Sequence, residues 1–406
     1  MAKRSPLHCW LGDVHVADFT SKRGWDLSCR YTAEALDCWP GNLPVLSCSL
    51  PLQARRLDAS AFLRGLLPEG AHLQAMAALA GVAANDTYAL LARFGRDVAG
   101  ALVISAEEGP PDQSRWGVEP YSAAQFEREI VDLGAGLGAR DDSELSLAGF
   151  QNKLLLVNLG PGWARPVRGQ PSTHILKVDH DRFGGLVAAE YAALRLAREL
   201  GLGDLDPQLV AVGGIECLIV RRFDRSEAEG RVARIHQEDV CQALGVRHDR
   251  ERGRGKYEAH GGPSFAQLAG VLSGRAAEPA AELDRLVRVV AFTSIVGNAD
   301  AHGKNLSLLY PEVGVPTLAP LYDTVPTALW SQLRSRAAMS VHGITNFDGI
   351  TVDAIADEAA SWGHSRARSS ELVRSVAEQA IDYVSDLGHE AVQELVMANS
   401  TKLLSD

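Results

Sequence analysis

Three oxygen-bearing side chains near residue 300 have the types and the spacing that phosphoryl transfer requires. Asp300 and Asn305 lie five residues apart in a polar loop, and Asp323 follows eighteen residues after Asn305. Phosphoryl transfer depends on positioning and charge neutralisation, with a base near the acceptor hydroxyl and Asn and Asp ligands for Mg²⁺. The spacing therefore predicts Asp300 as the base and the other two residues as metal ligands. The competing interpretation is that all three are helix caps and turn residues, positions that Asp and Asn favour.

A lysine and a glutamate upstream have the arrangement expected on the nucleotide side of such a site. Lys177 ends an apolar strand expected at 174–178, and Glu190 lies on the helix expected at 185–200. A lysine at this place can reach the α- and β-phosphates of ATP, and the glutamate can orient it. The alternative is a solvated lysine and a glutamate on the surface of the helix.

Two further segments are candidates for contacts with the nucleotide. Residues 146–153 form a small-residue stretch with one glycine ahead of a strand, so a turn there could direct backbone N–H groups at phosphates. A single glycine does not make a Walker loop, and an ordinary tight turn is the alternative. Arg222 and Phe223 follow the last strand of this region, where a hinge between two lobes could contact adenine.

The order of the expected elements indicates how the site is held. Apolar alternation and turn residues predict strands at 7–10, 14–19, 153–159, 174–178, 209–212, 216–220, 306–310 and 317–318. Capping residues and a 3.6-residue period predict helices at 58–67, 86–94, 122–133, 185–200, 237–244, 264–272, 281–295 and 371–387. The middle of the chain is thus expected to be a mostly antiparallel sheet with one inserted helix, followed by helices.

This order predicts an α+β, bilobal, protein-kinase-like fold. A sheet-containing N-terminal lobe with a small appended N-terminal subdomain would precede a mostly helical C-terminal lobe. The polar stretch 107–114, with two prolines, is expected to be a linker. We therefore expect a subdomain at 1–108, the N-terminal lobe at 109–224 and the helical lobe at 225–406.

Composition limits the classes of function. The 406 residues are 46% hydrophobic and 22% charged, which is typical of a globular protein, and the formal net charge is −11. An acidic chain does not favour a mainly electrostatic interaction with nucleic acid. The N-terminus lacks the apolar core of a secretory signal, and no window approaches the roughly 20 apolar residues of a membrane helix, so we expect a cytoplasmic protein without a membrane segment. The six cysteines are expected to be structural thiols rather than a metal site.

Ten motifs taken together resemble the HipA family of serine/threonine kinases from bacterial toxin–antitoxin systems. The most specific are GNADAHGKN at 297–305 and LAPLYD at 318–323. The others, in chain order, lie at 49–52, 95–101, 146–153, 173–177, 222–225, 236–239, 256–258 and 261–263.

The resemblance implies a role for each matching position. It implies that Asp300 is the catalytic base and that Asn305 and Asp323 bind Mg²⁺. It implies that ATP is contacted by Leu147, Ala148, Gly149, Phe150, Gln151, Asn152, Lys153, Lys177, Arg222, Phe223, His302 and Lys304. Glu190 would support the ATP lysine, and Ser146 would be the site of autophosphorylation. A phosphate there adds about −1.5 to −2 charges, which would repel the nucleotide and switch the kinase off.

The resemblance also implies partners and a biological role. A HipB-like helix-turn-helix antitoxin would bind the chain and supply most of the contact with DNA. The substrate would be a protein, with glutamyl-tRNA synthetase or another aminoacyl-tRNA synthetase as the candidate, and its modification would lead to growth arrest and persistence. Two alternatives remain open: a small-molecule phosphotransferase of the aminoglycoside- or lipid-kinase kind, and a catalytically idle corepressor scaffold.

Overall fold

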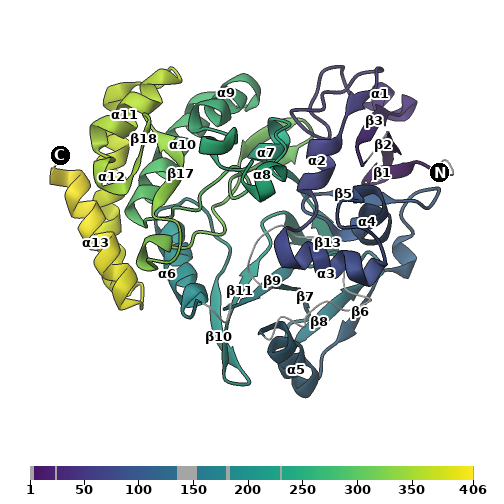
Figure 1. Ribbon diagram of the computed structural model, residues 1–406, viewed down its shortest axis with the longest axis horizontal. Helices are drawn as coiled ribbons and strands as arrows, with labels where there is room; N and C mark the ends of the chain where they lie inside the picture. The colour runs from purple at the N-terminus through teal and green to yellow at the C-terminus, as the bar shows by residue number, and fades with distance from the viewer. Residues whose placement is uncertain (1–3, 23–24, 135–152, 180–182, 229–230, 406) are drawn as a thin grey trace.

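The computed structural model describes residues 4–22, 25–134, 153–179, 183–228 and 231–405 (Figure 1). Its first part is a five-stranded antiparallel sheet in the order β4-β3-β2-β1-β5. The strands are β1 (Leu7–Leu11), β2 (Val14–Ser21), β3 (Leu27–Tyr31), β4 (Leu57–Asp58) and β5 (Leu102–Ser105). Helices accompany them: α1 (Ala33–Cys38), α2 (Ser60–Gly65), α3 (Gly70–Ala80) and α4 (Thr87–Phe94). Alternate strand residues such as Leu7, Phe19 and Ile104 are fully buried beneath these helices.

The second part is a six-stranded antiparallel sheet covered on both faces. Its order is β10-β11-β9-β7-β8-β6. The strands are β6 (Gly117–Pro120), β7 (Lys153–Asn158), β8 (Trp163–Val167), β9 (His174–Val178), β10 (Gln208–Val212) and β11 (Ile215–Arg221). Helix α5 (Ala123–Gly134) packs with Ile219 on one face, and α6 (Leu186–Glu199) packs with Leu218 and Val220 on the other. Because successive strand residues point to opposite faces, burial of both faces explains the runs of consecutive apolar residues in the central strands β7, β9 and β11.

The third part is mostly helical, and the long helix α10 (Pro279–Ile295) runs through its core. Around α10 lie α7 (Val240–Ala243), α8 (Arg250–Gly253), α9 (Phe265–Arg275), α11 (Val352–Ser361), α12 (Arg366–Tyr383) and α13 (Glu390–Ser405). Three small sheets complete it: β14 (His236–Asp239), β15 (Ser307–Glu312) and β16 (Val315–Leu318) in one, β12 (Arg225–Ala228) with β13 (Arg231–Arg234) in another, and β17 (Arg336–Val341) with β18 (Ile344–Asn346) in the last. In Figure 1 this part occupies the side opposite the N-terminal sheet.

A buried ionic cluster joins the first part to the rest. Asp97 lies 2.7 Å from Arg225, 3.1 Å from Arg234 and 3.7 Å from Arg222. Burial alone would raise the pKa of the Asp97 carboxyl, but the surrounding guanidinium groups hold it below its usual value. Asp224 also accepts a hydrogen bond from the backbone N–H of Gly100 at 2.7 Å. The cluster therefore ties the segment after α4 to the end of the second sheet.

The structure confirms the α+β class and the antiparallel central sheet with its inserted helix. The helix predicted at 237–244 is wrong in its first half, because residues 237–239 belong to β14 and pair with β15. Asp239 ends that strand and begins α7 with a reciprocal capping box to Gln242. The predicted linker is an exposed segment between the first two sheets, while the three-domain division stays a prediction. Within the described part of the chain, none of the helices combines the length and the apolarity needed to cross a bilayer.

Candidate active site

The predicted catalytic loop begins where α10 ends. Gly297 has φ +62°, and a Cβ atom there would lie 2.8 Å from the Ala328 methyl group, so only glycine fits this turn. The Asn298 side chain then accepts the backbone N–H of Asp300 at 3.0 Å, and the Thr327 hydroxyl accepts that of Ala299 at 2.8 Å. These contacts fix the loop locally and direct the Asp300 side chain away from the helix core.

Asp300 is held by a tyrosine from a different segment. The Tyr257 hydroxyl donates to Asp300 Oδ1 at 2.7 Å, and His302 Nε2 lies 3.8 Å from Oδ2. The surrounding protein raises the pKa of Asp300 by desolvation, and nearby Lys256 and the Tyr257 hydrogen bond oppose that rise. Asn305 donates from its amide to the Asp300 carbonyl at 2.9 Å. A carboxylate, an amide oxygen and an orienting hydroxyl thus meet at one loop.

Asp323 follows the strand pair β15–β16 and takes a left-handed backbone with φ +49°. Such a conformation is unfavourable for most residues other than glycine, although Asp tolerates it better than most, and strained residues cluster at functional sites. The Asp323 carboxylate accepts a short hydrogen bond from the Lys177 ammonium group. Its negative charge also contributes to the raised pKa of Asp300, so the two carboxylates share one electrostatic environment. Asp323 and the predicted base are therefore brought together from two separate segments.

Lys177 and Glu190 form a buried pair beside Asp323. Lys177 Nζ lies 2.6 Å from Glu190 Oε1, and the two side chains are 5% and 0% exposed. Burial would lower the pKa of Lys177, but the Asp323 and Glu190 carboxylates hold it above its usual value. The alternative of a solvated lysine and a surface glutamate is therefore wrong.

Two more lysines surround the same carboxylate. Burial lowers the pKa of Lys153 to about 8, with the Asp323 charge opposing that shift. Lys256 lowers the pKa of both Asp300 and Asp323 and lies 2.9 Å from Glu69, the residue that immediately precedes α3. Three ammonium groups next to two carboxylates form a suitable environment for a polyphosphate together with a cation. Hard carboxylate and amide oxygens from Asp323 and Asn305 match the donor set of Mg²⁺.

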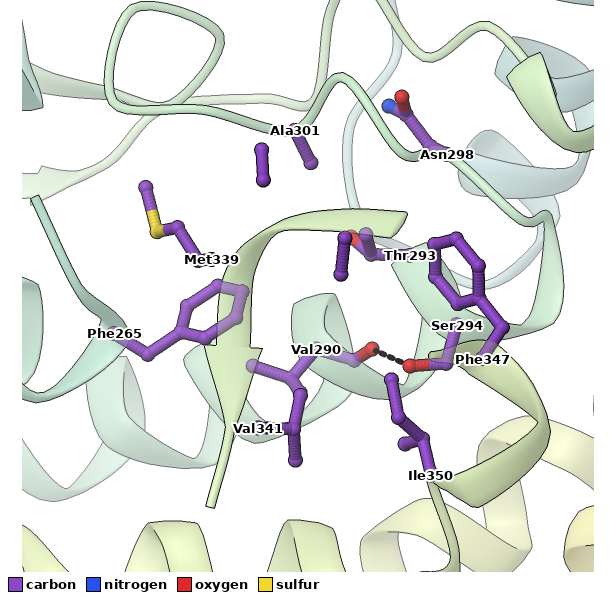
Figure 2. Close-up of a pocket in the computed structure, with 12 residues that line it drawn as sticks. Phe265, Val290, Thr293, Ser294, Asn298, Ala301, Met339, Val341, Phe347 and Ile350 are labelled. Carbon is purple, nitrogen blue, oxygen red and sulfur yellow. Dashed lines mark hydrogen bonds between the residues drawn. The ribbon is translucent and has the colours of Figure 1, made fainter. Parts of the chain in front are cut away.

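Beneath the catalytic loop the packing is nearly closed. A cavity of about 10 Å³ is lined by Asn298 and Ala301 from the loop and by Phe265, Val290 and Met339 from below (Figure 2). This volume has room for at most one water molecule, so the cavity cannot hold a nucleotide. It belongs to the apolar floor that supports the loop.

Two positions predicted to contact ATP have other partners in the structure. The Arg222 guanidinium is buried and donates to Asp224 at 2.7 and 2.9 Å. Lys304 is buried, and its ammonium group donates to Asp239 at 2.9 Å and to the Gly65 carbonyl at 3.1 Å. Both charges are compensated by these carboxylates, so the two side chains stabilise neighbouring segments, and their contact with ATP stays a prediction.

Of the remaining predicted residues, Phe223 and His302 lie in the described part of the chain. Phe223 packs against Tyr322, next to Asp323, with ring centroids 5.4 Å apart. His302 is buried, desolvation holds the pKa of its imidazole well below the usual value, and its Nδ1 accepts the Lys304 N–H at 3.2 Å. The segment from Ser146 to Asn152, which carries the predicted phosphate loop and the autophosphorylation site, lies outside the described residues.

The sequence reasoning missed three residues that act on the site. Tyr257 binds Asp300, Arg334 lies over the Tyr257 ring at 4.1 Å, and Glu69 contacts Lys256. The motif at 256–258 marks Tyr257 as a residue of interest, but its spacing does not indicate a contact with Asp300. Glu69 and Arg334 lie far from that motif in sequence, and no local pattern marks them.

Comparisons with known proteins match most of the chain to one family. A family model described as the HipA N-terminal domain matches residues 7–105, and one described as the HipA-like C-terminal domain matches residues 145–384. The chain is 38% identical over 348 residues to the putative kinase Y4mE of Sinorhizobium fredii, covering 82% of this chain and 80% of that protein. It is 32% identical over 356 residues to the serine/threonine-protein kinase toxin HipA of Shewanella oneidensis, covering 84% and 79%. The solved complex of Shewanella oneidensis HipA, HipB and operator DNA contains a chain that matches with a TM-score of 0.82 and 27% identity, covering 98% of this chain and 96% of that chain.

Proposed function

The chain belongs to the HipA family of kinases, and we propose that it is an ATP- and Mg²⁺-dependent serine/threonine protein kinase, the toxin of a HipA/HipB-type module. The observation that carries the proposal is the convergence of Asp300 and Asp323 with the buried Lys177–Glu190 pair. A helix-capping role for these residues would not require a buried lysine between two carboxylates. A scaffold without activity would not need that arrangement either.

In this proposal each side chain has one task. Asp300 accepts the proton of the substrate hydroxyl, and the Tyr257 hydroxyl keeps its carboxylate oriented. Lys177 keeps its contact with Glu190 and exchanges Asp323 for a phosphate oxygen of ATP. Asp323 and Asn305 hold Mg²⁺, which supplies charge neutralisation at the phosphates when it is bound. Lys153 and Lys256 add positive charge on the phosphate side of the site.

The central test replaces the base without changing its shape. Asp300→Asn should reduce transfer of the ATP γ-phosphate to protein by about 10²–10⁴-fold, the usual contribution of a general base. ATP binding, measured by calorimetry with Mg²⁺, should persist because Lys177 and Asp323 remain. Asp348→Asn, at an exposed position outside the site, is the matched control. Equal phosphoryl transfer by Asp300→Asn and the parent would refute the proposal.

The substrate is proposed to be a protein, with an aminoacyl-tRNA synthetase as the first candidate. Phosphoproteomics on cells that express the parent chain, compared with cells that express Asp300→Asn, identifies the modified hydroxyl groups. Serine or threonine phosphates that depend on Asp300 support a protein kinase. Rapid phosphorylation of an aminoglycoside with no protein phosphate would favour the small-molecule alternative. Growth arrest and persistence should follow expression of the parent only.

The proposed partner is a HipB-like helix-turn-helix antitoxin that supplies most of the DNA contact. The net charge of −11 supports this, because the chain offers little excess positive charge for a duplex. Co-expression followed by gel shift with operator DNA tests it: the chain alone should not shift the DNA, whereas the complex should.

Autophosphorylation at Ser146 is proposed as an off-switch of the kinase. Mass spectrometry after incubation with ATP and Mg²⁺ should find phosphate on Ser146 in the parent and none in Asp300→Asn. Ser146→Asp should bind ATP more weakly than the parent, since the added charge repels the triphosphate. Ser146→Asn is the neutral control of similar size. Unchanged ATP affinity in Ser146→Asp would rule out the switch.

A further inference from the structure

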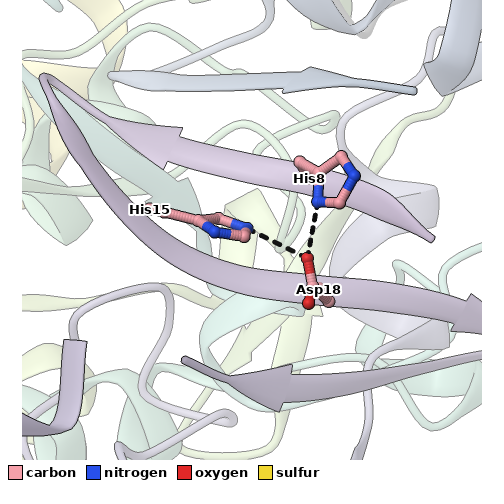
Figure 3. Close-up of side chains that lie close together, drawn as sticks. All are labelled: His8, His15 and Asp18. Atoms are coloured by element: carbon pink, nitrogen blue, oxygen red, sulfur yellow. Dashed lines mark hydrogen bonds and ion pairs between the residues drawn. The ribbon is translucent and has the colours of Figure 1, made fainter. Parts of the chain in front are cut away.

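Two histidines and an aspartate converge on the first sheet, in elements that carry none of the residues proposed for catalysis. Asp18 Oδ1 lies 2.7 Å from His8 Nδ1 and 2.9 Å from His15 Nε2 (Figure 3). One ligand atom from each of the three residues lies within 4.8 Å of the other two. Their side chains are 14%, 23% and 35% exposed, so the group is accessible from solvent without being freely mobile.

A β-bulge brings the three side chains to the same face. His8 and Asp18 are directly opposed across β1 and β2, but Trp10 pairs with His15, so Val16 has no partner on β1. In a regular strand His15 and Asp18, three residues apart, would point to opposite faces. The extra residue resets the alternation and turns His15 toward the face of Asp18. The convergence is thus built by the backbone and does not depend on chance side-chain rotamers.

His15 is fixed on several sides. Its ring stacks on Trp10 with centroids 4.7 Å apart and planes 18° apart. Its backbone N–H donates to Glu34 at 3.3 Å, and its carbonyl accepts the Thr32 hydroxyl in a short hydrogen bond. A ligand that is held before the ion arrives has little ordering entropy left to lose, which favours binding.

We propose that His8, His15 and Asp18 bind a divalent transition-metal ion of the Zn²⁺ type. Two imidazole nitrogens and one carboxylate oxygen suit Zn²⁺ better than Mg²⁺, which prefers oxygen ligands alone. Zinc–ligand bonds of about 2.0–2.2 Å in a tetrahedron separate ligand atoms by about 3.3 Å. The separations of 2.7 and 2.9 Å from Asp18 Oδ1 are each about 0.5 Å shorter than this, and the two histidine nitrogens lie within 4.8 Å of each other, so side-chain adjustments would bring the three atoms to the zinc spacing.

The other interpretation is an acid that bridges two imidazole groups without any metal. The charged neighbours do not decide between the two: Arg30 faces Asp18 from β3 and disfavours a cation, while Glu34 lies at His15 and favours one.

Three protein ligands leave at least one coordination position for water. An ion at this place would connect β1 to β2 across the bulge, and it would stabilise the folded subdomain because the unfolded chain lacks the site.

The experiment uses the full chain without a polyhistidine tag, stripped with a chelator and kept in excess Mg²⁺ to occupy the proposed kinase site. Calorimetric titration with Zn²⁺ should give one equivalent bound, and Zn²⁺ should raise the melting temperature. His8→Gln, His15→Gln and Asp18→Asn should each weaken Zn²⁺ binding at least about ten-fold. His342→Gln, at an exposed histidine elsewhere, and Asp300→Asn should bind Zn²⁺ like the parent.

A spectroscopic measurement on the parent alone guards against variants that fail to fold. With Cu²⁺ as a probe, electron paramagnetic resonance should show hyperfine splitting from two imidazole nitrogens. No Zn²⁺ binding by the parent, equal binding by the three variants, or a Cu²⁺ spectrum without nitrogen splitting would each overturn the proposal. None of these results depends on kinase activity, so they leave the proposed function untouched.

Discussion

Removing the Tyr257 hydroxyl should shift the pH dependence of the proposed kinase without removing its base. The hydroxyl donates to Asp300 Oδ1 at 2.7 Å, and this bond stabilises the ionised carboxylate. Burial already raises the pKa of Asp300, and the Tyr257 bond is one of the interactions that oppose the rise. In Tyr257→Phe that opposition is lost, so the pKa of Asp300 should increase further.

The size of the shift follows from the contact. A hydrogen bond to a charged group contributes about 1.5–3 kcal/mol, and one pKa unit corresponds to about 1.4 kcal/mol. The Asp300 side chain is 40% exposed, so solvent screening favours the lower end of this range. We therefore expect an increase of about one pKa unit. Because a base is active only when it is deprotonated, the acidic limb of the activity profile should move upward by about one pH unit.

The assay is the pH profile of kcat/KM for phosphoryl transfer, compared between the parent, Tyr257→Phe and Tyr383→Phe as a tyrosine control in α12. Tyr257→Phe should approach the parent above its acidic limb, since the ring and its contact with Arg334 remain. The control should match the parent at every pH. An unchanged acidic limb combined with a uniformly lower plateau would refute the reasoning, because it would mean that Tyr257 does not stabilise the carboxylate.

Three further predictions concern stability and backbone geometry. Asp97→Asn should lower the free energy of unfolding by about 3 kcal/mol, since it removes one of the two buried carboxylates, Asp97 and Asp224, that compensate the buried arginine charges; denaturant unfolding beside the exposed Asp112→Asn measures this, and equal midpoints would contradict it. Burial raises the pKa of the Glu238 carboxyl from an ordinary value of 4.5 to about 7. Between about pH 4.5 and pH 7, the folded chain therefore keeps a proton on Glu238 that the unfolded chain has lost. The parent should therefore lose stability as the pH rises from about 4.5 to 7, and Glu238→Gln should lose less, as urea midpoints at pH 5 and pH 8 would reveal. Gly297→Ala should lower both activity and melting temperature because its Cβ would lie 2.8 Å from a neighbouring methyl group, whereas Gly270→Ala, in open space on α9, should be neutral or stabilising by about 0.5–1 kcal/mol; similar behaviour of the two variants would count against a strained turn.

The sequence predicted those elements whose local pattern and tertiary environment agree. The strand at 174–178 was predicted with its observed bounds because its apolar run is buried between two helices. The helix predicted at 237–244 failed at residues 237–239, where hydrogen bonds to β15 outweigh local helix preference. Such pairing is formed with residues about 70 positions away, so no window around residue 238 contains the information.

The candidate site was predictable where one loop carries it and less so where the fold assembles it. Asp300 and Asn305 share a loop, and the backbone of that loop brings them together. The contact between Lys177 and Asp323 spans 146 positions and depends on how the second sheet meets the helical lobe. Arg222 and Lys304 are predicted from their motifs to contact ATP, and the structure shows that buried carboxylates compensate both charges. A motif locates a residue, but only packing decides which group its side chain faces.

The N-terminal subdomain contacts the predicted active site directly. Glu69 lies 2.9 Å from Lys256, which acts on both carboxylates of the site, and 4.0 Å from Lys304. The Gly65 carbonyl also accepts a hydrogen bond from Lys304, within the predicted catalytic loop. Without these acceptors, the Lys304 ammonium group would keep Asp239 as its one buried carboxylate partner. A buried charge with fewer partners is unfavourable, because burial has removed the water that would otherwise stabilise it. A displacement of α2 and α3 would therefore disturb the loop that carries Asp300. A partner that binds the subdomain and moves these helices would thereby change the rate of phosphoryl transfer.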